Sequence, residues 1–240
     1  MRSHVAGVLV TVAALVAGPA LAADLPEYPV APPVDNGLGG AFYLRASVGL
    51  NSHWSGEHQF VSAGGVYGTN NPTTAGYGYS FGAGFGYEAG NGLRADVTFD
   101  QINDKGLSDG IDTLELRTSL ALANAYYDFP LGGWGTGGLG AYVGAGLGGA
   151  YYQTTVTANA GGPVAGVPDG SGWTAAAAAM AGVTYDMGSA VADLGYRLVY
   201  LPQVSNGAAA ISDPAGPFTP YYINNNLISE VRGSLRYRFN

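Results

Sequence analysis

The side chains best suited to metal binding or catalysis lie in one short stretch, SHWSGEH, which places His53 and His58 near Glu57. Two imidazoles and a carboxylate are ligands that Zn²⁺ accepts. Ser52 and Ser55 flank His53, and a Ser–His pair is the minimal arrangement for nucleophilic catalysis, here of a lipid-modifying kind. A loop does not preset the geometry of these groups, and no acidic partner stands out. We therefore interpret them as solvated surface residues.

Two further patterns resemble known sites without completing them. Asp104, Asp109 and Asp112 are acidic neighbours, but their spacing is not that of a calcium-binding loop. The glycines of Gly144-x-Gly146-x-x-Gly149 match a dinucleotide fingerprint, but no helix pattern follows them. The chain has no cysteine, which excludes disulfides, thiolate metal sites and a cysteine nucleophile. We therefore predict no catalytic site, no metal site and no cofactor.

Charged and apolar side chains alternate along several extended segments. The final stretch, VRGSLRYRFN, alternates Arg232, Arg236 and Arg238 with large apolar residues. Successive side chains of a β-strand point to opposite faces, so such a segment has one apolar and one polar face. The pattern occurs in residues 41–51, 77–88, 93–100, 113–123, 139–152, 173–185, 190–201 and 227–239.

The polar faces of these segments carry seven arginines and six acidic residues. The set comprises Arg45, Glu88, Arg94, Asp96, Asp100, Glu115, Arg117, Asp193, Arg197, Glu230, Arg232, Arg236 and Arg238. Arginine pairs well with carboxylates through its planar, multi-donor head. We expect these residues to form salt-bridged clusters, one of them made by Arg94, Asp96, Glu115 and Arg117.

Two architectures accommodate such segments. A soluble sandwich or lipocalin-like barrel turns its polar face to water, whereas a transmembrane barrel turns its apolar face to lipid and its polar face to the lumen. Segments of roughly 9–13 residues suit strands that cross a bilayer at a tilt. Short and long connections also alternate, with long ones expected at 52–75, 101–112, 153–172 and 202–226. We therefore predict an all-β, eight-stranded, antiparallel up-and-down transmembrane β-barrel with an apolar exterior and a polar lumen.

This architecture makes specific predictions for individual segments. The leucines of 113–123 should face lipid, and Ser119 should face the lumen. The alanine-rich residues 174–182 fit a strand, although a short helix is the alternative. Whether residues 60–68 add strand structure stays open. Aromatic residues at the segment ends are expected to form the interfacial girdles of the barrel: Tyr77, Tyr87, Tyr151, Trp173, Tyr185, Tyr200 and Phe239.

The N-terminal sequence indicates export. Arg2 and His4 precede an apolar run, and Ala20-Leu21-Ala22 fits a signal-peptidase site, with cleavage after Ala22 or Ala23. We expect a signal peptide at 1–22, a proline-rich periplasmic tail at 23–40 and the barrel at 41–240.

The chain has 17 acidic residues against 9 Lys plus Arg, which argues against a nucleic-acid partner.

Four motifs resemble those of small outer-membrane barrels, the opacity-type, porin-family surface proteins of alphaproteobacteria. They are NAYYDF at 124–129, AYVGAGLG at 141–148, DLGYR at 193–197 and the closing segment 230–239. Alanine stands at 141 where the family usually has proline. The resemblance covers residues 41–239 and implies that Leu235, Tyr237 and Phe239 form a C-terminal signal for the barrel-assembly machinery, here followed by Asn240.

These observations predict a non-enzymatic outer-membrane protein of a Gram-negative bacterium, with a structural role in the envelope and in surface interactions. Its lumen should be plugged by Arg/Asp/Glu pairs, and its partners should be outer-membrane lipids and lipopolysaccharide. A small porin, or a binder of a hydrophobic or haem-like ligand, is the alternative. A lipid-modifying enzyme is a more remote one.

Overall fold

A computed structural model describes residues 40–62, 65–108, 112–131, 138–158, 169–206 and 218–239. The expected signal peptide at 1–22, the tail up to residue 39 and Asn240 lie outside the described residues. Within the described ranges, no helix has the length and hydropathy needed to cross a membrane.

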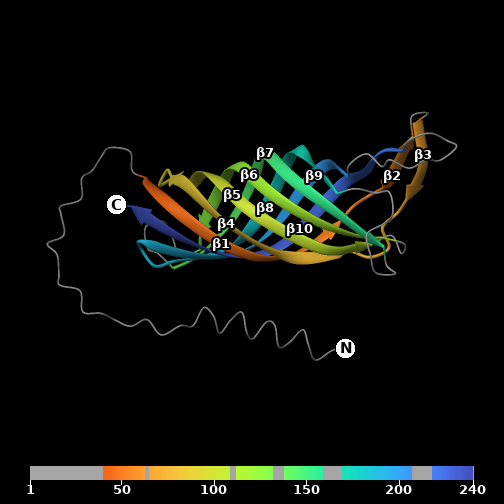
Figure 1. The fold of residues 1–240 in the computed structure, drawn as a ribbon. Helices are drawn as coiled ribbons and strands as arrows, with labels where there is room; N and C mark the ends of the chain where they lie inside the picture. Colours follow the sequence, from red (N-terminus) through yellow and green to blue (C-terminus); the bar gives the residue numbers. More distant parts are fainter. Residues whose placement is uncertain are drawn as a thin grey trace, which may run out of the picture. The chain divides into compact units, whose positions relative to one another are not determined.

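The described chain is a series of antiparallel strands (Figure 1). They are β1 (Ala41–Trp54), β2 (His58–Ser62), β3 (Gly65–Asn70), β4 (Gly76–Glu88), β5 (Leu93–Ser108), β6 (Asp112–Pro130), β7 (Gly138–Ala158), β8 (Gly170–Asp186), β9 (Ala190–Ser205) and β10 (Phe218–Phe239). Eight of them pair in the order β1-β4-β5-β6-β7-β8-β9-β10, and β10 pairs with β1 to close the ring. Each of these strands contains one predicted segment, so the eight-stranded up-and-down barrel is confirmed. Residues 174–182 belong to β8, so the helical alternative is wrong.

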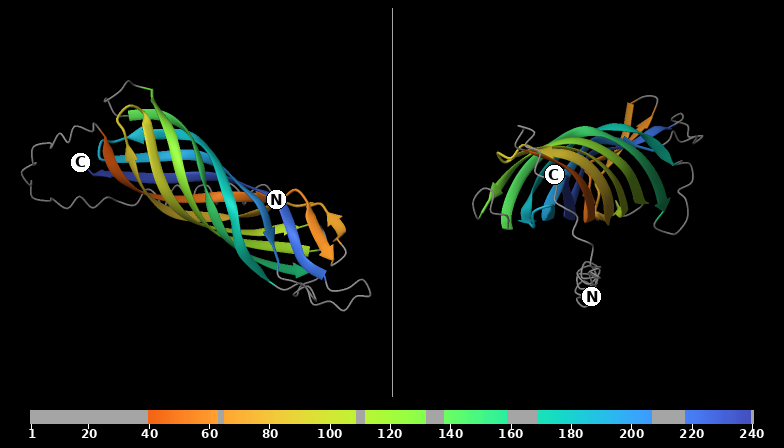
Figure 2. Two further views of the ribbon diagram at one scale, coloured as in Figure 1. Left: turned by 90° about the horizontal axis from the view of Figure 1, so that it is seen from above. Right: turned by 90° about the vertical axis from the view of Figure 1, so that its left-hand side faces the viewer.

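The strands of the ring are strongly staggered, as Figure 2 shows by their slanted course. Following paired residues from Trp54 through β10, β9, β8, β7, β6, β5 and β4 leads back to Leu44, ten residues (54 minus 44) along β1. A stagger of this size tilts the strands by roughly 40°. An eight-stranded barrel of this kind leaves an interior just wide enough for side chains to fill.

The two ends of the barrel differ. Ala41 and Phe239, where β1 starts and β10 finishes, lie at the end that also carries the short connections after β4 and β8. We call this the turn end, and the opposite end, which carries the hairpin of β2 and β3, the loop end (Figure 1). The hairpin pairs with the first residues of β10, as in Phe218 opposite Ser62, so residues 60–62 and 65–68 do add strand structure. The long connection predicted at 101–112 is wrong, because β5 and β6 extend to within three residues of each other at 109–111.

Toward the turn end, the wall has an apolar outside and a polar inside, as predicted. On β1, Phe42, Leu44 and Val48 are about half exposed on the outside, whereas Tyr43 and Arg45 are buried inside. Gly86 lies opposite Tyr43 in the register, and its missing side chain makes room for the Tyr43 ring. This outward apolar belt fits hydrocarbon rather than water.

On β6 toward the loop end, the polarity of the wall is reversed. Leu114, Leu116 and Leu120 of β6 are buried inside the barrel, while Glu115 and Arg117 lie on the outside. The prediction that these leucines face lipid, and that Ser119 faces the lumen, is therefore wrong. The physical reason is that β6 has 19 residues, more than the 9–11 or so that a bilayer-spanning strand needs. The extra length has water outside, so polar side chains point outward and apolar ones form a core.

Candidate functional site

The candidate functional site is the filled lumen, in which arginines and carboxylates pair in three groups. The first lies at the turn end. Arg236 pairs with Glu88 and, at 3.0 Å, with Asp193; Arg238 pairs with Glu88 at 2.7 Å and with Asp186 at 2.8 Å. Since Glu88 and Asp186 belong to β4 and β8, these contacts tie distant parts of the ring to β10.

The second group combines charges with aromatic rings. Arg94 Nε lies 2.9 Å from an Asp128 oxygen, and its guanidinium stacks 3.8 Å from the centre of the Tyr126 ring. Arg45 lies 3.4 Å from Asp96, which also accepts a hydrogen bond of 2.8 Å from the Tyr43 hydroxyl. The rings exclude water from these pairs, and the cation–π contact adds to the binding of each arginine.

The third group crosses the middle of the lumen. Arg197 donates to Asp100 at 2.7 Å and to Glu230 at 2.8 Å, so its guanidinium bridges β5 and β10. Arg232 pairs with Asp100 at 2.5 Å and donates to Ser47. All four charged side chains are at most 5% exposed. Removing one partner from such a buried network strands an uncompensated charge.

An apolar cluster fills the lumen between the third group and the loop end. It contains Ile102, Leu116, Leu120, Leu201 and Ile228, each at most 2% exposed. These side chains come from β5, β6, β9 and β10 and pack across the ring. The lumen is therefore filled by ion pairs at one level and by a hydrophobic core at the next.

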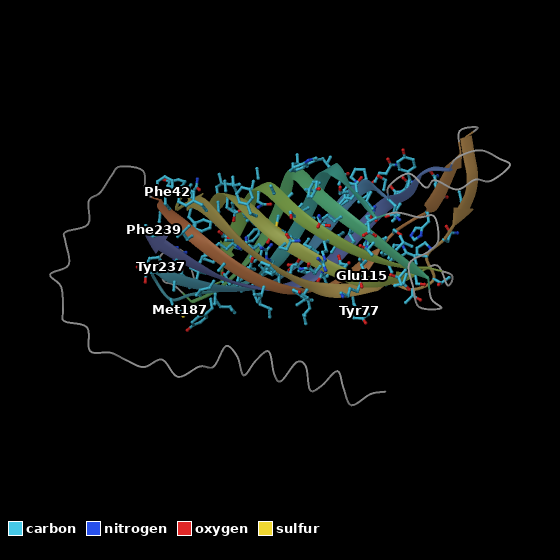
Figure 3. The ribbon with its side chains drawn as sticks, viewed as in Figure 1. Phe42, Tyr77, Glu115, Met187, Tyr237 and Phe239 are labelled. Carbon is cyan, nitrogen blue, oxygen red and sulfur yellow. The ribbon has the colours of Figure 1, made fainter. Side chains whose placement is uncertain are left out.

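The structure places the predicted luminal residues in these three groups, with the exceptions of Glu115 and Arg117. Glu115 pairs with Lys105 at 3.4 Å on the outer surface, and Arg117 is exposed there too, as the labelled Glu115 illustrates (Figure 3). The cluster expected from Arg94, Asp96, Glu115 and Arg117 is therefore wrong, because polar side chains of β6 at this level face water.

Three luminal carboxylates were missed by the sequence reasoning. Asp104, Asp128 and Asp186 lie just beyond the predicted ends of their segments, at strand positions that the structure adds. Asp104 and Asp186 continue the predicted luminal parity of their segments, so extending the alternation by a few residues would have found them. Asp128 shares the parity of the β6 leucines that were predicted to face lipid, so the same extension would have placed it on the wrong face.

The histidines are buried, so their interpretation as solvated surface residues is wrong. His53 is fully buried and its Nε2 lies 3.0 Å from Asn226 Oδ1, while His58 Nε2 lies 2.8 Å from Ser55 Oγ. Glu57 remains exposed and accepts a hydrogen bond from Gln59. Since Ser55 is fully buried, it has no solvent-accessible surface at which a substrate could reach it.

The other candidate motifs show no site. Asp104 is buried on β5 and Asp112 begins β6, while Asp109 lies outside the described residues. The glycine fingerprint lies within β7, which continues as a strand to Ala158. In the ranges that the structure describes, no group of three or more His, Cys, Asp or Glu side chains is arranged to hold a metal ion.

A cavity of about 500 Å³ opens at the turn end. Glu88, Asp128, Asp186 and Arg238 line it together with backbone of the adjoining turns. Its inner wall includes Arg236, whose side chain is only 2% exposed and belongs to the first ion-pair group. This cavity is therefore a vestibule in front of the filled lumen.

Aromatic residues lie on the outside of the barrel near both ends of the apolar belt. Tyr77 and Trp173 are strongly exposed toward the loop end, and Trp173 packs on Tyr151 at 5.3 Å between ring centres. At the turn end, Tyr185 is exposed and Tyr87 packs on Phe42 at 4.9 Å. Tyr200 is 39% exposed and donates to Asn225. The positions fit interfacial girdles.

The closing residues of β10 also face outward. Leu235, Tyr237 and Phe239 are each about half exposed, and the Tyr237 and Phe239 rings pack at 5.5 Å. Figure 3 shows Phe42, Tyr237 and Phe239 grouped at the turn end. An outward apolar row at the end of the chain leaves these side chains accessible for recognition.

Comparisons with known proteins agree with this architecture. No family model matches the sequence. An uncharacterized protein of Brucella suis biovar 1 (strain 1330) is 33% identical over 92% of this chain and 93% of its own length. An uncharacterized protein of Brucella abortus (strain 2308) matches with the same identity and coverage.

Among solved structures, Neisserial surface protein A matches with a TM-score of 0.50 and 20% identity, over 82% of this chain and 97% of that one. The outer membrane protein OprG from Pseudomonas aeruginosa matches with a TM-score of 0.49 and 15% identity, over 83% and 97%. The chain belongs to the family of the Brucella proteins, and its fold is that of a small, eight-stranded β-barrel.

Proposed function

We propose that this protein is a non-enzymatic, non-conducting barrel of the Gram-negative outer membrane that contributes to envelope integrity and surface properties. The observation that supports this proposal is the filling of the lumen by three ion-pair groups and an apolar core. A water path along the barrel would have to cross both. The signal peptide expected at 1–22 would direct export, with the turn end in the periplasm and the loop end outside the cell.

The proposed partners follow from the surface of the barrel. The apolar belt would contact outer-membrane lipids, and the polar outer wall above it would contact lipopolysaccharide and the cell's surroundings. The row Leu235, Tyr237 and Phe239 would be read by the barrel-assembly machinery. Each of these contacts uses side chains that the structure places on the outside.

The experiment is a planar-bilayer recording of the purified, refolded barrel. We expect no steady single-channel conductance, because paired charges and packed apolar side chains fill the interior of the barrel. The matched positive control is a double variant, Leu116→Ser with Leu120→Ser, which replaces buried leucines of that core with small polar residues. A stable, ion-selective conductance from the unchanged protein would promote the small-porin alternative.

The apolar core also supports a second candidate function, which is the binding of a hydrophobic or haem-like ligand. The specific observation is that apolar side chains and the buried His53 occupy the same half of the lumen. Titration with haem, followed by its absorption band, distinguishes the two functions. A saturable spectral change that His53→Ala abolishes would favour the ligand binder, and unchanged spectra would favour the structural barrel.

A further inference from the structure

A row of polar side chains crosses four neighbouring strands just above the third ion-pair group. In the register, Glu230 of β10 lies opposite Asn51 of β1, Asn51 opposite Gly78 of β4, and Gly78 opposite Asp104 of β5. Because Gly78 has no side chain, Asp104 reaches across β4, and Asn51 Nδ2 donates to Asp104 Oδ1 at 2.6 Å. A Cβ at Gly78 would lie 2.8 Å from that same carboxylate oxygen.

Three oxygens of this row lack hydrogen-bond donors. Asp104 Oδ2, Asn51 Oδ1 and Glu230 Oε1 accept no hydrogen bond from any group that the structure describes. The three residues are 2%, 6% and 0% exposed. The amide oxygen of Asn51 is held beside Asp104, because the nitrogen on the same carbon is bonded to that carboxylate. Buried acceptors left without a partner are costly to the folded state.

The charges around this row do not balance. Arg197 and Arg232 are the arginines of this level, and their contacts go to Asp100 and Glu230. Asp104 makes no ion pair with any described residue, and it is the third carboxylate against two arginines. Burying an ionised carboxylate without a positive partner is strongly unfavourable. Ordered water would satisfy the oxygens, but it would leave the extra negative charge.

We propose that Asp104, Asn51 and Glu230 hold one monovalent cation of the sodium class inside the barrel. Hard cations prefer oxygen ligands, and the row offers carboxylate and amide oxygens only. A single positive charge balances the single excess carboxylate, whereas a divalent ion would overcompensate it beside two arginines. The described residues also lack the three-carboxylate or histidine cluster typical of a tightly held divalent metal.

The experiment measures the unfolding temperature of the refolded full-length barrel in detergent. One series contains increasing NaCl, and the other contains choline chloride at the same ionic strength. Choline is too large for the site, so it reproduces charge screening without binding. We expect a saturable rise in the unfolding temperature in sodium of a few degrees, as ligand binding to the folded state alone requires, and no such rise in choline.

Two variants test the assignment to this row. Asp104→Asn removes the excess charge, so its unfolding temperature should be the same in sodium and choline and should exceed that of the unchanged barrel in choline. Asp128→Asn is the matched control, since Asp128 belongs to the second ion-pair group near the turn end. It should keep the full difference between sodium and choline.

Two results would overturn the proposal. If the unchanged barrel unfolds at the same temperature in both salts, Asp104 is neutralised by a proton rather than by a cation. If Asp104→Asn keeps the sodium-dependent rise, the ion binds elsewhere. Neither result affects the conductance experiment, so this inference and the proposed function fail independently.

Discussion

Arg197 offers the sharpest test of the filled lumen. Its guanidinium is 1% exposed and connects Asp100 at 2.7 Å with Glu230 at 2.8 Å. Replacing it by alanine removes both contacts and leaves two buried carboxylates. Arg232 remains 2.5 Å from Asp100, but its Nε lies 3.7 Å from Glu230 Oε1, so Glu230 loses its main partner.

The expected magnitude follows from the burial of the pair. Breaking a buried ion pair by removing one partner costs about 3–5 kcal/mol. Arg197 serves two carboxylates, so we expect Arg197→Ala to lie in the upper part of this range. A second substitution should recover part of the loss: Glu230→Gln in the Arg197→Ala background removes the stranded charge, which is the main source of the penalty.

The assay is urea unfolding of the barrel in lipid vesicles, with folded protein counted by its heat-modifiable migration on gels. The matched control is Arg117→Ala, because Arg117 lies exposed on the outer wall and makes no ion pair with any described residue. Its free energy of unfolding should stay within about 0.5 kcal/mol of the unchanged protein. Equal urea midpoints for Arg197→Ala and Arg117→Ala would refute the view that luminal ion pairs hold the barrel together.

Three more predictions test the faces of the wall and the end of the chain. Val143→Arg places a cation on the lipid-facing belt of β7 and should cost about 2–4 kcal/mol in the same assay, whereas Gln153→Arg, on the polar outer wall near the loop end, should be tolerated. Leu116→Ala opens a cavity in the apolar core and should lower the free energy of unfolding by about 2–5 kcal/mol. Ser119→Ala, outside that core, should leave it unchanged. The reverse order would show that the faces of β6 are misassigned. Phe239→Ala should lower the amount of assembled barrel in cells and increase periplasmic degradation, measured by gel migration of membrane fractions, and normal assembly would place the signal elsewhere.

The sequence by itself determined the strands and the faces of the membrane-spanning belt. Alternation of side chains specifies a strand and its two faces locally, as in Phe42 against Tyr43. The charged parity of β10, with Arg232, Arg236 and Arg238, likewise identified its luminal face. These features depend on neighbouring residues in the chain, so a single segment is enough to reveal them.

Only the tertiary structure decided which face of a strand meets which solvent along its full length. Leu116 and Arg117 alternate as residues of a lipid-facing strand would. They lie beyond the apolar belt, where water outside the barrel favours polar side chains on the outer face and apolar ones inside. An alternation of period two does not show where the lipid-facing part of a strand ends. The register of the strands and the thickness of the bilayer determine that position.

The pairing of charges was also a property of the closed ring. Arg236 meets Glu88 because β10 and β4 both flank β1, and Arg197 meets Asp100 across the lumen although 97 residues separate them in the chain. His53 is buried for the same reason, since β1 extends to Trp54 and turns that side chain inward toward Asn226. Strand stagger and closure bring these residues together, and neither is encoded in the spacing of a single segment.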